Sequence, residues 1–150
     1  MRFRHLHLIR YGLFKDRLLN FPAGDGDFQL ICGSNEAGKS TTRDAVSDLL
    51  FGFEQRSPYG FLHDLSSLRI GAELEHKKQK LKFERKKGNR ETLRDMNDEA
   101  LPDSVLALYL GAVDRDFFAR MFSLNHQQLR SGGREILDND PRPKLDGTRR

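Results

Sequence analysis

Residues 33–40 have the sequence Gly-Ser-Asn-Glu-Ala-Gly-Lys-Ser, which fits the spacing of a phosphate-binding loop, Gly-x-x-x-x-Gly-Lys-Ser. The glycines let the backbone turn successive N–H groups toward phosphate oxygens. Lys39 is expected to place its ammonium group against the β- and γ-phosphates, and Ser40 to ligate Mg²⁺. We expect nucleotide contacts from the whole run and the residue after it: Gly33, Ser34, Asn35, Glu36, Ala37, Gly38, Lys39, Ser40 and Thr41.

Such a loop needs a strand before it and a helix after it, and the sequence predicts both. Residues 28–32 (Phe-Gln-Leu-Ile-Cys) are mostly apolar, as is typical of a buried central strand. After the loop, apolar residues recur at helical spacing, which predicts an amphipathic helix over residues 39–52. The positive end of that helix would face the phosphates.

The remaining pattern predicts an α/β fold: a mixed sheet around strand 28–32, the helix 39–52 packed on it, and a β-rich flank. Alternating residues near the N-terminus indicate a strand covered mainly on one face. The further expected elements are strands at 2–10, 17–21, 68–77 and 79–87, an irregular loop at 54–66, a short helix capped by Asp103 or Ser104 and ended by Gly111, and a helix capped by Asp114.

Composition excludes several classes of protein. The chain has 150 residues, enough for one domain of ordinary size, and its eleven phenylalanines argue against wholesale disorder. No stretch approaches the roughly 18 apolar residues of a membrane span. The one cysteine, Cys32, excludes an internal disulfide and a cysteine-based zinc cluster. We therefore expect a cytoplasmic protein with no membrane partner.

Positive charge is concentrated in residues 77–87, where seven of the eleven residues are Lys or Arg. One interpretation is a strand that presents ammonium groups to a DNA backbone through Lys77–Lys87. The other is a solvated strand whose lysines discourage edge-to-edge pairing. Phe83, the aromatic residue of the run, lies on the face opposite Lys80 and Lys82, so no aromatic residue accompanies these lysines, which favours the second interpretation.

The chain resembles the SMC-like and RecF-like coiled-coil ABC ATPases of recombination and repair, and most of all their YhaN-like branch of AAA-labelled ATPases. The resemblance rests on the aromatic turn at 10–14 (Arg-Tyr-Gly-Leu-Phe), the phosphate loop, and the segments 56–64, 68–72 and 117–137. It covers residues 1–137, and the phosphate loop (Walker A) is its one motif that is specific by itself.

The resemblance implies an N-terminal lobe over residues 1–137, followed by a polar, flexible tail over 138–150. The C-terminal lobe of such a head, with its signature motif and Walker B strand, would come from elsewhere, in cis or trans, or from a second head. The family's Q-loop would fall in residues 121–129, with Gln127 or His126 in the place of the glutamine. Residues 131–133 (Ser-Gly-Gly) suggest either a loop after the Q-loop or the signature motif.

The predicted function is ATP and Mg²⁺ binding by the N-terminal half of an SMC-like ATPase head concerned with DNA repair or maintenance. The chain contains no Walker B strand and no acidic residue placed to orient the attacking water, so we predict weak binding and little or no turnover. The alternatives are a non-hydrolysing nucleic-acid-binding module, a truncated gene product, or another P-loop NTPase. A kinase or GTPase would need a later Asp-x-x-Gly or Asn-Lys-x-Asp pattern, which the sequence lacks.

Overall fold

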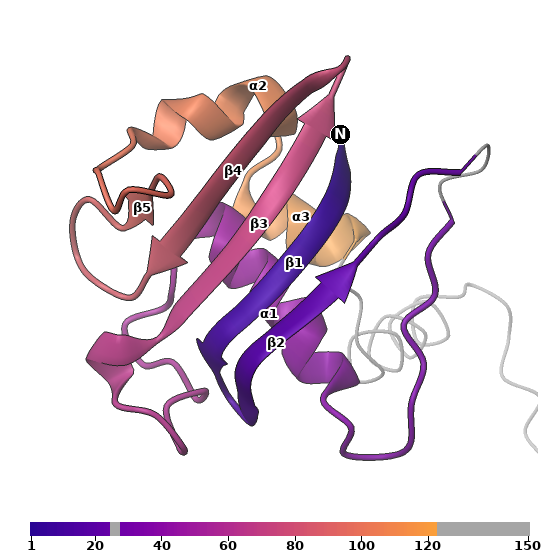
Figure 1. The fold of residues 1–150 in the computed structure, drawn as a ribbon. Helices are drawn as coiled ribbons and strands as arrows, with labels where there is room; N and C mark the ends of the chain where they lie inside the picture. Colours follow the sequence, from indigo (N-terminus) through magenta and orange to yellow (C-terminus); the bar gives the residue numbers. More distant parts are fainter. Residues whose placement is uncertain (25–27, 123–150) are drawn as a thin grey trace, which may run out of the picture.

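The computed structural model describes residues 1–24 and 28–122, which form one antiparallel sheet with helices on one of its faces (Figure 1). The strand order is β2-β1-β3-β4-β5, and every neighbouring pair is antiparallel. The strands are β1 (Arg2–Tyr11), β2 (Phe14–Asn20), β3 (Arg69–His76), β4 (Gln79–Lys86) and β5 (Leu93–Arg94).

The helices come from two parts of the chain. Helix α1 (Lys39–Phe51) follows the phosphate loop and lies across the covered face of the sheet (Figure 1). The 3₁₀ helix η1 (Leu65–Ser67) precedes β3. After β5 come the 3₁₀ helix η2 (Asp103–Leu106), which continues into α2 (Ala107–Leu110), and α3 (Arg115–Met121), which packs against α1. No helix in these two ranges is long and apolar enough to cross a membrane.

The core lies between the sheet and α1 because one side of each strand alternates with the period of the pleat. Leu6 and Leu8 of β1, Ile70 and Leu74 of β3, and Phe83 of β4 are fully or almost fully buried. Helix α1 covers them with its own apolar stripe, which includes Ala45 and Leu49. The opposite face of the sheet carries charged side chains, so the domain buries the sheet on one side within the described residues.

Most of the expected elements are confirmed with small changes in their limits. The structure has strands at 2–11, 69–76 and 79–86 and a helix at 39–51, close to the expected ranges. Strand β2 starts earlier than expected because β1 turns back through Gly12 and Leu13 alone, which pairs Tyr11 with Phe14. The Asp114 carboxylate accepts the Phe117 N–H and caps α3, as predicted.

Two smaller predictions need correction. The helix expected after residue 103 is formed, but neither Asp103 nor Ser104 caps it; Pro102 occupies the N-cap position of η2, without a side-chain hydrogen bond. Residues 91–101, which the sequence left unassigned, contribute the two-residue strand β5 beside β4.

The predicted central strand at 28–32 is wrong, and with it the mixed sheet around that strand. These residues form no strand, and the sheet is antiparallel with β3 at its centre. Phe28 is 84% exposed and Leu30 is 75% exposed. An apolar run becomes a buried strand only when neighbouring strands satisfy its N–H and C=O groups, and no described strand pairs with it. Cys32 is exposed as well, so its expected burial is also wrong.

Candidate phosphate-binding site

The predicted loop lies directly before α1 and leads into its first turn (Figure 1). Gly38 is the N-cap residue of α1 and has a left-handed backbone, with φ of +89°. Glu36 also has a positive φ, of 64°, and the Ala37 N–H donates to the Ser34 carbonyl oxygen at 3.3 Å. Alternation of left-handed and right-handed residues makes the concave backbone that binds anions, so the local geometry suits phosphate.

Gly38 is required for a second reason, which is space. A Cβ atom built on Gly38 would lie 2.3 Å from Cζ of Phe14. The Phe14 ring of β2 therefore packs directly on the backbone of the loop. Only glycine combines this contact with a φ of +89°, which explains the second glycine of the motif at this position.

Lys39 holds the loop together from inside. Its ammonium group donates to the carbonyl oxygens of Gly33 at 2.9 Å and Ser34 at 2.6 Å. The side chain therefore crosses the concave side of the loop, where the motif places it against phosphate. The cation neutralises carbonyl dipoles that would otherwise repel an anion.

The free face of the loop opens into a hollow of about 540 Å³. Ser40 and Thr41 line it together with Asn35 and Glu36, and Leu13 of the β1–β2 turn forms an apolar wall. No side chain of the described residues caps the N-terminal end of α1, so its first N–H groups remain for a ligand. Ser40 lies on this hollow, as a ligand of nucleotide-bound Mg²⁺ would.

The β1–β2 turn is fixed beside this hollow by loop 54–64. The Gly12 N–H donates to the Tyr59 carbonyl oxygen at 2.9 Å, and His63 Nε2 lies 2.8 Å from the Phe14 carbonyl oxygen. A Cβ atom on Gly12 would lie 2.8 Å from Cγ2 of Thr41. The turn, the loop and the first turn of α1 are thus in direct contact.

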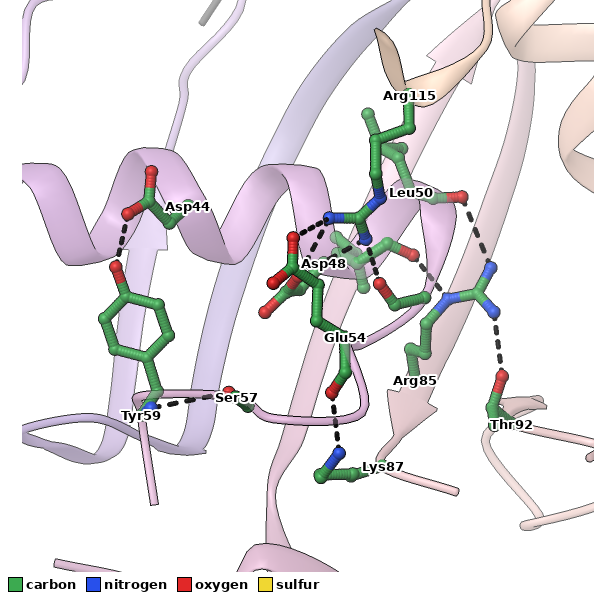
Figure 2. A network of polar contacts seen from close by, with 12 residues as sticks. Asp44, Asp48, Leu50, Glu54, Ser57, Tyr59, Arg85, Lys87, Thr92 and Arg115 are labelled. Carbon is green, nitrogen blue, oxygen red and sulfur yellow. Dashed lines mark hydrogen bonds and ion pairs between the residues drawn. The ribbon is translucent and has the colours of Figure 1, made fainter. Parts of the chain in front are cut away.

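The C-terminal end of α1 holds buried polar residues that the sequence analysis missed (Figure 2). Arg85 of β4 is 2% exposed and donates to the carbonyl oxygens of Leu49 at 2.6 Å and Leu50 at 3.3 Å. Its guanidinium also contacts Thr92 and Asp103, at 2.9 and 2.8 Å. The sequence contained a signal for the burial of Arg85, because this residue alternates in phase with the inward-facing Leu81 and Phe83.

Asp48 is the second residue of this kind, on the buried face of α1. Its carboxylate accepts the Tyr11 hydroxyl at 2.8 Å and lies 3.3 Å from the Arg115 guanidinium of α3. Burial raises the pKa of Asp48, against the opposing effect of Tyr11 and Arg115. Burial and the Asp48 carboxylate likewise raise the pKa of Tyr11, so its hydroxyl stays a donor.

Several cations of the basic run at 77–87 have polar partners in the structure. Lys80 and Lys82 lie 3.7 and 3.3 Å from the Glu73 carboxylate on the outer face of the sheet. Lys87 donates to the carbonyl oxygens of Glu54 and Gln55. Lys77 and Lys78 are exposed at the β3–β4 turn. The strand itself is confirmed as β4, while DNA binding through Lys77–Lys87 and a role of the lysines against edge-to-edge pairing stay predictions.

Several predicted features lie outside the described residues. They are the Q-loop candidates His126 and Gln127, the Ser-Gly-Gly sequence at 131–133, and the tail at 138–150. These remain predictions from the sequence.

Comparison with known proteins supports the phosphate-loop interpretation. A protein family described as "AAA domain" matches residues 1–142, almost the entire chain. The chain belongs to this AAA-domain family. The AAA-domain family is related to the P-loop ATPases, which generally use ATP and Mg²⁺.

A relative shows how much of a larger protein this AAA domain represents. The chain is 31% identical over 130 residues to "Uncharacterized protein YhaN" of Bacillus subtilis (strain 168). The match covers 83% of this chain but 13% of that relative. The chain therefore spans only a small part of that relative's length.

Proposed function

We propose that the AAA domain binds ATP with Mg²⁺ at residues 33–41, as the N-terminal half of an SMC-like ATPase head. The observation that carries this proposal is the hollow in front of α1, where a left-handed Gly38, the Lys39 ammonium group and uncapped helix N–H groups converge. Lys39 would exchange its two carbonyl contacts for the β- and γ-phosphates. Ser40 would hold Mg²⁺, and Thr41 would contact the α-phosphate.

Leu13 defines where the rest of the nucleotide lies. It is 41% exposed and is the apolar side chain that lines the hollow with the loop. Once the phosphates occupy the backbone N–H groups, the nucleoside would extend along this wall and bury apolar surface there. Hydrolysis would still require an acidic residue to orient water and a signature motif from a facing head.

We further propose that the partner is the remaining part of the head, supplied in cis or in trans, in a protein concerned with DNA repair or maintenance. The exposed apolar side chains of Phe28, Leu30 and Ile31 support this because a free chain would gain by covering them. The length of the relative supports it as well, since 87% of that protein lies outside the match.

The test is nucleotide binding to the 150-residue chain, measured by isothermal titration calorimetry with ATP and MgCl₂. We expect measurable heat for the wild type and at least a tenfold loss of affinity in Lys39→Ala, about 1.4 kcal/mol or more. Lys80→Ala, which removes an exposed lysine far from the loop, is the matched control and should bind as the wild type does.

Two outcomes would contradict the proposal. The first is no heat from well-folded protein with either adenosine or guanosine triphosphate. The second is equal affinity in Lys39→Ala and wild type. Steady-state hydrolysis that disappears in Lys39→Ala would instead show that the chain turns over ATP without the rest of the head, against our expectation.

A further inference from the structure

Helix α3 is held on the domain by few contacts, and Arg115 makes most of the polar ones. None of the residues of α3 is buried. The ring of Phe118 packs on Phe51 with centroids 5.4 Å apart, while Phe117 and Met121 are 49% and 58% exposed. A short helix with so little buried apolar surface belongs to the least stable part of a fold. Its position therefore depends on polar anchoring.

The guanidinium of Arg115 supplies that anchor at the C-terminal end of α1 (Figure 2). It lies 3.3 Å from the Asp48 carboxylate and 3.6 Å from the Glu54 carboxylate, and it donates to the Gly52 carbonyl oxygen. A planar guanidinium can satisfy several acceptors at fixed angles, which an ammonium group cannot. Arg115 thus joins α3 to the end of α1 and to the loop that follows it.

Asp48 connects this anchor to the phosphate loop through a second partner. Its other oxygen accepts the hydroxyl of Tyr11, the last residue of β1. Tyr11 stacks on Tyr59 with centroids 4.5 Å apart. It is followed by Gly12, which lies against Thr41, and by Leu13, which lines the hollow. A ligand in the hollow would contact both α1 and this turn, the two elements that hold Asp48.

We propose that Arg115 is a positioning residue that couples occupancy of the phosphate loop to the docking of α3. The inference rests on the proposed nucleotide binding. A nucleotide that orders the β1–β2 turn and the first turn of α1 fixes Tyr11 and Asp48, so that Arg115 binds a carboxylate that is already held in place. Coupling is reciprocal, and docking of α3 therefore strengthens nucleotide binding by the same factor.

The test is hydrogen exchange of the amides at 118–122, with and without a non-hydrolysable ATP analogue and Mg²⁺. In the wild type we expect the ligand to slow this exchange at least about threefold. In Arg115→Ala the exchange should be about tenfold faster without ligand and should not respond to it. Nucleotide affinity of this variant should fall by the factor by which the ligand slows exchange in the wild type, which loss of packing alone would not produce.

Two variants make the result specific. Arg120→Ala removes an exposed arginine of the same helix and should leave both the exchange and its response to nucleotide unchanged. Arg115→Lys keeps the charge but not the planar donor set, so it should retain part of the coupling; it also carries the test if Arg115→Ala does not fold.

The outcomes separate this inference from the proposed function. Nucleotide binding that slows the α3 amides equally in Arg115→Ala and wild type would overturn the role of Arg115 and leave the proposed function intact. Absence of any nucleotide binding in the wild type would overturn both. Equal exchange in Arg115→Ala and Arg120→Ala without ligand would overturn the anchoring itself.

Discussion

At its N-terminal end, α1 presents uncapped N–H groups to an open hollow, whereas at its C-terminal end its carbonyl oxygens are bound by buried or half-buried arginines. Arg85 binds the carbonyls of Leu49 and Leu50, and Arg115 binds that of Gly52. Both ends of a helix have unsatisfied backbone groups. Here the protein satisfies one set and leaves the other without a side-chain cap, so the proposed binding site and the stabilising contacts lie at opposite ends of the helix.

The largest effect should come from the C-terminal end of α1, where arginines bind the carbonyl oxygens. Arg85→Met should lower the free energy of unfolding by about 3 kcal/mol because it leaves two buried carbonyl oxygens without partners and Asp103 without its cation. Urea denaturation followed by circular dichroism measures this change. Lys86→Met, the neighbour on the other side of the strand, is the matched control and should change stability by less than about 0.5 kcal/mol. Equal stability of the two variants would contradict the stabilising role of Arg85 at the C-terminal end of α1.

At the open end, Gly38→Ala should have the next largest effect. The new methyl group meets the Phe14 ring at 2.3 Å and forces alanine into a left-handed backbone, for a combined cost of about 2 kcal/mol. Thermal unfolding, together with nucleotide titration, measures the loss. The double variant Phe14→Ala/Gly38→Ala separates the two causes, since it removes the clash and leaves the backbone strain. If the clash with the Phe14 ring causes the whole loss of stability, the double variant should be almost as stable as Phe14→Ala alone.

The smallest effect concerns the outer face of the sheet, away from both ends of α1. Burial alone would raise the pKa of Glu73, but Lys82, Lys80 and His5 outweigh it and hold the pKa below its ordinary value of 4.5. Glu73 therefore contributes stability above pH 4.5 that is lost as the pH falls through its lowered pKa. Glu73→Gln should remove this contribution, at most about 1 kcal/mol. The difference between wild type and variant in urea denaturation, followed from pH 7 to pH 3, measures it.

The same variant tests the remaining DNA prediction. Glu73→Gln releases Lys80 and Lys82 from their acidic partner without adding bulk. If this face contacts a phosphate backbone, duplex binding should become tighter and more salt-dependent. Unchanged or absent binding at low salt would argue that the lysines act only as solvated strand residues.

Local patterns in the sequence predict the elements whose structure depends mainly on their own residues. The alternation in β1, β3 and β4 and the apolar stripe of α1 are complete within each segment, and the Asp114 cap needs only the helix that follows it. The strand expected at 28–32 fails because burial depends on neighbours that no local pattern reveals. Arg85 and Asp48 were recoverable from their phase on apolar faces, whereas nothing in the sequence near Arg115 indicates its partners on α1.

The stacked pair of Tyr11 and Tyr59 has a practical consequence. The chain contains three tyrosines and no tryptophan. Two of the three tyrosines, Tyr11 and Tyr59, stack beside α1, where Asp48 and Asp44 accept their hydroxyl groups. Rings held in a fixed asymmetric setting give near-ultraviolet circular dichroism, which disappears when tertiary packing is lost. The protein thus carries its own optical reporter beside the proposed nucleotide site, without any label.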